Sequence, residues 1–152
     1  MMTEHFVIQS DIALLPLVEE RLFHFCHECH VGRYHATVSV AVMQAVENAI
    51  VHGNGADGDK TVDLTFGTCR GGLFVEVADQ GAGFDPSDFG RLGADGEVKG
   101  EGLFVMRRLA DRLTFADGGR RVRMEFAVAG IDPADALERV AVLQQHFALV
   151  AA

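Results

Sequence analysis

Two pairs of β-strand patterns, each pair joined by a glycine turn, constrain the fold of this chain more than any other feature of its sequence. They are residues 62–66 and 73–77 around Arg70-Gly-Gly72, and residues 113–116 and 121–128 around Asp117-Gly-Gly119. In the first pair, Val62-Asp-Leu-Thr-Phe66 alternates apolar and polar side chains, as a half-buried strand does. Strand patterns joined by a tight turn form hairpins, so we expect an antiparallel sheet.

Helical patterns bracket the two hairpins. After a short strand at residues 6–9, helices are predicted at about residues 11–25, 36–51, 103–113 and 133–150. Asp11 is suited to cap the first helix, and the glycine-rich segment His52-Gly-Asn-Gly55 is suited to end the second. Helices that bracket hairpins, rather than alternating with strands, indicate an α+β fold with helices on one face of a mostly antiparallel sheet and solvent on the other.

Length and charge exclude several classes of protein. A chain of 152 residues suits one domain with a single core. The formal net charge of -9 argues against nucleic acid as a partner, because a phosphate-binding surface needs clustered Lys and Arg. No stretch approaches the roughly 18 apolar residues of a membrane span, and Met1-Met-Thr-Glu-His5 lacks the pattern of a secretory signal. We therefore expect a cytoplasmic protein with no membrane partner.

The second helix carries a polar stripe although it is otherwise mostly apolar. Gln44, Asn48 and His52 recur every four residues and so fall on one face of a regular helix. Taken alone, such a stripe is more typical of a helix side that meets solvent. An Asn carbonyl oxygen can also coordinate Mg²⁺, which bridges nucleotide phosphates.

Two glycine motifs follow along the chain. In the first, Asp79 ends a strand and is followed by Gly81, Gly83 and Phe84, so that the backbone can approach a ligand while the carboxylate accepts a hydrogen bond from an amino group. In the second, Gly100 and Gly102 precede a helix that begins at Leu103, and free amides at a helix N-terminus favour bound phosphate. An ordinary turn and an ordinary helix cap are the alternatives.

The three motifs, in this order, resemble those of the GHKL ATPase superfamily, which includes gyrase, heat-shock chaperones, histidine kinases and mismatch-repair ATPases. The most similar branch is that of the bacterial anti-sigma-factor serine/threonine kinases. Ala45-Val-Glu-Asn48-Ala-Ile-Val-His52-Gly53 resembles the N box, residues 79–84 the first glycine box and residues 100–111 the second. The resemblance covers roughly residues 5–128.

The resemblance implies a two-layer sandwich, with helices on one face of a mostly antiparallel, mixed sheet, that binds ATP and Mg²⁺. It implies that Asn48 holds Mg²⁺, that Asp79 accepts from the adenine amino group, and that Gly100 and Gly102 lie under the phosphates. The other implied ATP-binding residues are His52, Gly81, Gly83, Phe84 and Leu103. Residues 85–99 are implied to form a lid, and the implied partners are a sigma factor or an anti-sigma antagonist protein.

One position departs from that branch. Where its members typically have a glutamate as general base, four residues before the N-box Asn, this chain has Gln44. An amide cannot usefully take up a serine proton, and Glu47, which points about 60° to one side of Gln44 on a regular helix, is a possible but geometrically poor substitute. Three functions therefore stay open: a slow serine/threonine kinase, a module whose ATP occupancy shapes a protein-binding surface without turnover, and a detached histidine-kinase ATPase domain.

The segment Cys26-His-Glu-Cys29-His30 formally matches a haem attachment pattern, and its residue types also suit zinc. Consecutive helix residues diverge by about 100°, so these side chains point in several directions. We therefore expect Cys26 and Cys29 to be reduced thiols that pack inward, and the histidines to meet solvent.

The ATP-binding domain is expected to span residues 1–130, and residues 131–152 to form a helical extension of the same domain. Two alternatives stay open for the apolar side of that last helix: packing on the domain, or a contact in a homodimer.

Overall fold

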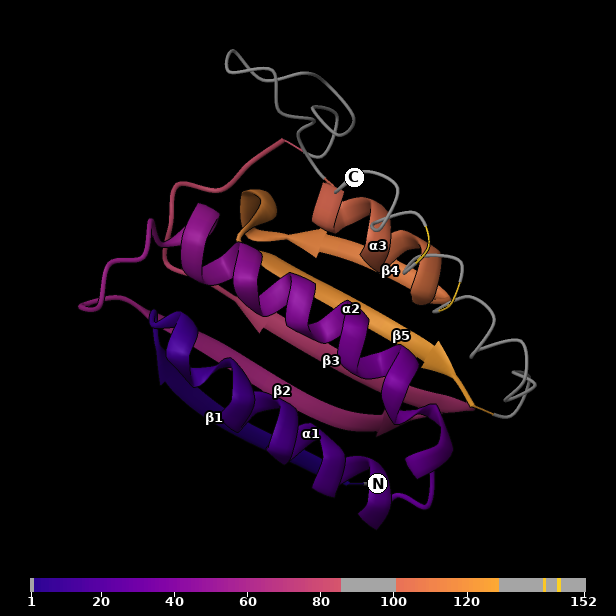
Figure 1. The fold of residues 1–152 in the computed structure, drawn as a ribbon. Helices are drawn as coiled ribbons and strands as arrows, with labels where there is room; N and C mark the ends of the chain where they lie inside the picture. Colours follow the sequence, from indigo (N-terminus) through magenta and orange to yellow (C-terminus); the bar gives the residue numbers. More distant parts are fainter. Residues whose placement is uncertain (1, 86–100, 129–140, 142–144, 146–152) are drawn as a thin grey trace.

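The computed structural model describes residues 2–85, 101–128, 141 and 145, and the strands among these residues form one five-stranded sheet (Figure 1). The strands are β1 (Thr3–Gln9), β2 (Thr61–Cys69), β3 (Gly72–Ala78), β4 (Arg112–Ala116) and β5 (Arg121–Ala127). Their order in the sheet is β1-β2-β3-β5-β4, and each neighbouring pair is antiparallel. Both predicted hairpins, β2 with β3 and β4 with β5, are confirmed.

The alternation of the strands determines which side of the sheet is buried. Cross-strand pairs such as Leu64 with Val77 and Phe66 with Val75 lie in the core. On the opposite face, Glu76 accepts from Arg121 at 3.3 Å and from Arg123 at 2.9 Å, and these side chains are partly exposed. This polar face is the one that the alternation predicted to meet solvent.

Among the described residues, three helices cover the apolar face, and α2 (His35–Asn48) lies between α1 (Leu15–Glu28) and α3 (Glu101–Leu109) (Figure 1). Before α1, the 3₁₀ turn η1 (Ile12–Leu14) is capped by Asp11, which accepts from the amide of Ala13 at 3.0 Å. A second 3₁₀ turn, η2 (Gly32–Tyr34), joins α1 to α2, and a third, η5 (Asp117–Gly119), closes the β4–β5 hairpin. The predicted α+β fold, with helices on one face of an antiparallel sheet, is confirmed.

The third helix is shorter than its sequence pattern predicted, since α3 ends at Leu109 and not near Leu113. The chain joins the sheet at Asp111, whose amide donates to the carbonyl of Glu125 at 2.9 Å. The carboxylate of Asp111 also accepts from the amide of Ala127 at 2.8 Å. These long-range bonds, which helical periodicity does not reveal, end the helix and start β4.

The predicted last helix and the extension 131–152 lie outside the described residues, apart from Ala141 and Gln145. No helix in the described parts of the chain is long and apolar enough to cross a membrane.

Candidate nucleotide site

The start of α3 lies directly against the polar stripe of α2. A Cβ atom at Gly102 would lie 2.7 Å from Nδ2 and 3.1 Å from Oδ1 of Asn48, and 3.2 Å from Oε1 of Gln44. Real Cβ atoms do not approach other atoms as closely as the first of these distances. The second glycine motif therefore allows α3 to begin beside both amides, and the structure brings Gln44, Asn48 and Gly102 together.

Glu47 is exposed, whereas Gln44 and Asn48 are half-buried. The carboxylate nearest in sequence to Gln44 is therefore more open to solvent than Gln44 itself.

A π-helical turn, η3 (Ala49–Gly53), follows Asn48 and extends α2. Its wider ring is closed by the amide of Asn54, which donates to the carbonyl of Ala49 at 2.8 Å. Such turns occur mostly within α-helices at functional sites. The polar stripe was predicted from regular α-helical spacing, which does not hold in this turn. Here His52 is exposed, and Gly53 lies against the side chain of Asp79, just after β3.

Gly53 and the first glycine motif are in direct contact. A Cβ atom on Gly53 would overlap the carboxyl group of Asp79, and a Cβ atom on Gly81 would overlap the carbonyl oxygen of Gly53. These contacts require glycine at both positions, so the end of the N-box segment and the loop after β3 pack backbone against backbone.

Asp79 is held in a defined orientation but has spare hydrogen-bonding capacity. Its amide donates to the carbonyl of Arg120 at 2.9 Å, and its Oδ1 accepts from the amide of Gly81 at 2.8 Å. No donor among the described residues reaches Oδ2. Burial raises the pKa of the Asp79 carboxyl, although the Gly81 amide, Arg120 and Lys60 act in the opposite direction. A carboxylate with this environment is a strong acceptor for an added donor.

Asn54 connects the two motifs, and sequence analysis did not identify it as a site residue. Its side chain is 2% exposed. Nδ2 donates to Oγ of Ser10 at 2.7 Å and to the carbonyl of Thr61 at 2.9 Å, and Oδ1 accepts from the amide of Gln80 at 2.7 Å. In the sequence, Asn54 stands between two glycines and is typical of a turn residue, so no local pattern indicates that it is buried.

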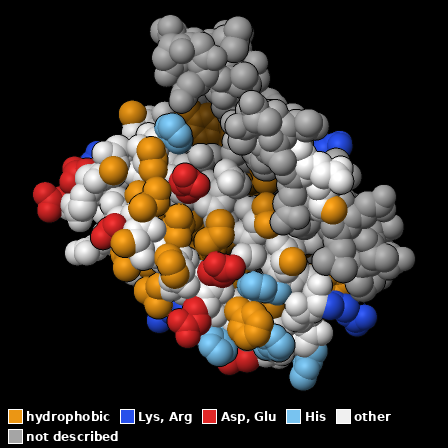
Figure 2. Space-filling model, in the orientation of Figure 1, with side chains coloured by type: hydrophobic (Ala, Val, Ile, Leu, Met, Phe, Trp, Pro, Cys, Tyr) orange, Lys and Arg blue, Asp and Glu red, His pale blue; other side chains and the backbone are white. Residues whose placement is uncertain are grey.

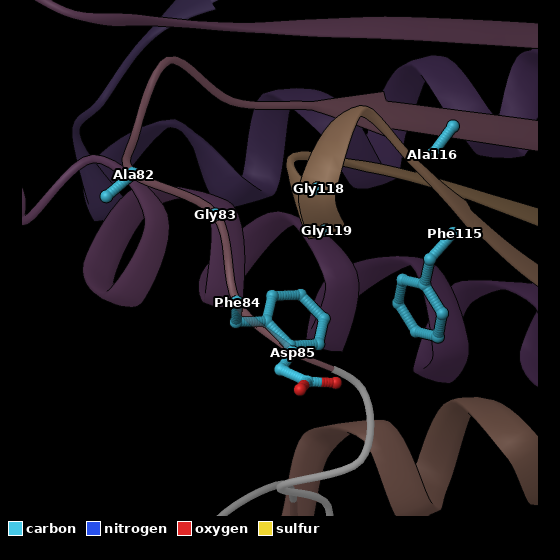
Figure 3. A pocket seen from close by; sticks show the side chains of 8 residues that line it. All are labelled: Ala82, Gly83, Phe84, Asp85, Phe115, Ala116, Gly118 and Gly119. Carbon is cyan, nitrogen blue, oxygen red and sulfur yellow. The ribbon is translucent and has the colours of Figure 1, made fainter.

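The far end of the first glycine loop packs on the β4–β5 hairpin. Gly83 has a φ of 84°. The amide of Phe84 donates to the carbonyl of Gly118 at 2.9 Å, and the rings of Phe84 and Phe115 meet edge-on with 5.3 Å between their centroids. A hollow of about 520 Å³ opens between this loop end and the hairpin turn (Figure 3). Neither Asn48 nor Asp79 lines it, so Phe84 borders a neighbouring hollow and not the contact around Gly102.

Two further predicted site residues belong to the second glycine motif. Leu103 is 8% exposed and packs in the core, so a ligand contact from this residue falls to its backbone. Gly100 and the predicted lid at residues 86–99 lie outside the described residues, whereas Asp85 is described.

The cysteine and histidine segment packs as expected. Cys26 is fully buried and Cys29 partly buried, whereas His27 and His30 are exposed. Burial raises the pKa of the Cys26 thiol to about 12. Among the described residues, no group of three or more His, Cys, Asp or Glu side chains is arranged to hold a metal ion.

Helices on one face of an antiparallel sheet, a half-buried Asn opposite a helix N-terminus and the loop Asp79-Gln-Gly81 at a strand end form the arrangement that the resemblance implied. The sequence model of the histidine kinase-like ATPase domain matches residues 18–126, and the chain belongs to this family. Membership confirms the resemblance to the GHKL superfamily. No curated protein matches the chain.

Proposed function

We propose that this protein is an ATP-binding regulator of the anti-sigma-factor type that transfers phosphate slowly because Gln44 stands at the position of the general base. The observation that carries the proposal is the contact of Gly102 with both Gln44 and Asn48. It places two side-chain amides at the N-terminus of a helix, where backbone N–H groups without intrahelical acceptors favour phosphate.

The chemistry of the described residues fits Mg-ATP. Asn48 offers a carbonyl oxygen to Mg²⁺, which takes oxygen ligands. The Oδ2 atom of Asp79 has no donor among the described residues and suits the adenine amino group. Gly53 and Gly81 bring the backbone close to this carboxylate, where a side chain at Gly53 would overlap it. In this proposal Gly102 and the first turn of α3 hold the phosphates, and bound Mg²⁺ supplies charge stabilisation for phosphoryl transfer.

In this proposal Gln44 limits the rate of phosphoryl transfer. Removal of a general base costs about 10²- to 10⁴-fold in rate, whereas positioning and charge stabilisation, which dominate phosphoryl transfer, do not need it. In this proposal the acceptor is a serine or threonine of an anti-sigma antagonist, the other partner is a sigma factor, and the protein acts in the cytoplasm with these regulators.

The test uses γ-labelled ATP, Mg²⁺ and a candidate antagonist protein with three forms of the chain. The unmodified chain should label the antagonist slowly, Gln44→Glu should label it faster by about 10²-fold or more, and Glu47→Gln should behave like the unmodified chain. Rapid stoichiometric labelling by the unmodified chain would show that Gln44 does not limit transfer.

The exposed position of Glu47 favours one second candidate, a module that binds ATP without turnover, because the described carboxylate nearest in sequence cannot replace the base. If neither the unmodified chain nor Gln44→Glu labels the antagonist while both bind ATP, this candidate replaces the slow kinase. An acid-labile phosphohistidine product would instead identify a detached histidine-kinase ATPase domain.

A further inference from the structure

The outer surface of η1, α1 and α2 carries large apolar side chains that stay exposed among the described residues. Ile12 is 48% exposed, Leu17 44% and Phe23 43%. Val40 and Met43 of α2, a helix of the same layer, are partly buried. We call these five residues the helix-layer patch. Figure 2 shows hydrophobic side chains gathered over α1 and α2, as this set predicts.

The patch is one surface because α1 and α2 run antiparallel and side by side (Figure 1). Oγ of Ser39 on α2 donates to Oε1 of Glu19 on α1 at 3.5 Å, and the ring of Phe23 meets that of His35 at 5.2 Å. These cross-helix contacts join the middle of α1 to the first half of α2. Val40 and Met43 therefore lie beside the first half of α1, where Leu17 is exposed.

Phe23 has the properties of an anchor for a partner. Its ring contacts His24 at 5.8 Å, His27 at 4.3 Å and His35 at 5.2 Å between ring centroids, yet the side chain stays 43% exposed. An aromatic side chain that is already oriented by its neighbours loses little conformational entropy when a partner covers it, and such residues dominate binding energy at interfaces.

The charges around the patch are acidic. Glu19, Glu20 and Glu47 are exposed on α1 and α2, and Figure 2 shows acidic side chains among the hydrophobic ones, with Lys and Arg near the edges of the view. Residues 12–51 contain two basic side chains other than histidine, Arg21 and Arg33. Arg21 pairs with Glu4 at 3.0 Å and stacks over Phe6 on β1. Arg33 lies in the turn before α2, with its guanidinium 5.7 Å from the centroid of the Tyr34 ring. The patch is thus apolar, with acidic side chains around Leu17 and histidines around Phe23, and Nε2 of His24 lies 4.0 Å from Oε1 of Glu20.

We propose that the helix-layer patch docks a basic amphipathic segment of a partner protein, with Phe23 and Leu17 covered by its apolar side and Glu20 facing its Lys or Arg side chains. Charge complementarity selects this occupant: a second copy of the chain would place acidic side chains opposite acidic side chains, and an anionic lipid surface would be repelled. Docking lies apart from the candidate nucleotide site, because Gln44 and Asn48 contact α3 on the other flank of α2.

The test measures fluorescence anisotropy of a labelled 18-residue helical peptide with Leu on one face and Lys on the other, titrated with the full chain. The unmodified chain should bind, and its affinity should fall as salt is raised. Leu17→Ser and Glu20→Lys should each weaken binding by about fivefold or more, since loss of an interface contact costs about 1 kcal/mol or more. Asp59→Lys, which makes the same charge change on an exposed loop outside the patch, should weaken it far less.

Three results would overturn the proposal: no binding by the unmodified chain, equal losses for Asp59→Lys and Glu20→Lys, or equal binding of a peptide whose Lys residues are replaced by Glu. Sedimentation of the same proteins adds a fourth, a dimer of the unmodified chain that Leu17→Ser dissociates, because the occupant would then be a second copy. Mg-ATP affinity should be the same in the Leu17→Ser and unmodified chains, so failure of docking and failure of the proposed ATP site are separable.

Discussion

Replacing Asn54 by Ala should loosen the contact between the N-box segment and the first glycine loop. The side chain is 2% exposed and makes three hydrogen bonds, to Ser10, Thr61 and Gln80. At about 1 kcal/mol net for each bond, the variant should lose about 3 kcal/mol of unfolding free energy. For a domain of this size, a loss of that order lowers Tm by about 6 to 12 °C.

The same variant should weaken ATP binding. Gln80 follows Asp79 directly, and the hydrogen bond from its backbone amide to Oδ1 of Asn54 fixes the start of the first glycine loop. An orientation cost of about 1.4 kcal/mol corresponds to a tenfold loss of affinity. Thermal unfolding followed by circular dichroism and calorimetric titration with Mg-ATP measure the two effects on one preparation.

Gln80→Ala is the matched control, since Gln80 is exposed and its side chain makes one bond in this network, to the amide of Thr61 at 2.7 Å. It should cost about a third as much stability as Asn54→Ala. If the Tm of Asn54→Ala lies within about 2 °C of that of the unmodified chain and the variant binds ATP equally well, the buried network does not position the first glycine loop.

Three further changes test separate parts of the structure. Gly102→Ala should weaken Mg-ATP binding by about tenfold at a stability cost of about 1 to 3 kcal/mol, because the new methyl group displaces Asn48; calorimetry showing full affinity would contradict the contact. Burial raises the pKa of the Asp79 carboxyl in the folded chain, so the free energy of unfolding falls as pH rises from the ordinary Asp pKa through the raised one. Asp79→Asn should remove this loss and give a higher Tm at pH 7, together with weaker ATP binding. Cys26 should resist alkylation in the folded chain and react only after unfolding, as mass spectrometry of the labelled peptides would report; rapid labelling in the native state would contradict its burial.

The parts of the fold that depend on local pattern were predictable from the sequence. Alternation in Val62-Asp-Leu-Thr-Phe66 and its partner identified the first hairpin, because the period of side-chain direction is a property of one strand. The extent of β1 was not predictable in the same way: it begins at Thr3, earlier than the apolar residues indicate, because pairing with Gly67 of β2 extends it.

The site was predictable at the level of its motifs and not of its contacts. The spacing of Gln44 and Asn48 and the glycine at position 102 were visible in the sequence, and the structure brings them together. The burial of Asn54 depends on bonds to residues far along the chain, such as Ser10 and Gln80, whereas the π turn after Asn48 is closed by the amide of Asn54 itself. Periodicity assumes a regular helix and cannot report a wider turn.

The central claim is that Asn48 and Asp79 belong to one Mg-ATP site, and calorimetric titration with ATP tests it most directly when done in Mg²⁺ and in EDTA. The unmodified chain should bind one ATP in Mg²⁺, and Asn48→Ala should weaken binding by about tenfold in Mg²⁺ but little in EDTA, because that side chain acts through the ion. Asp79→Asn should weaken binding in both buffers. Absence of binding by the unmodified chain, or full affinity of both variants in Mg²⁺, would contradict the account.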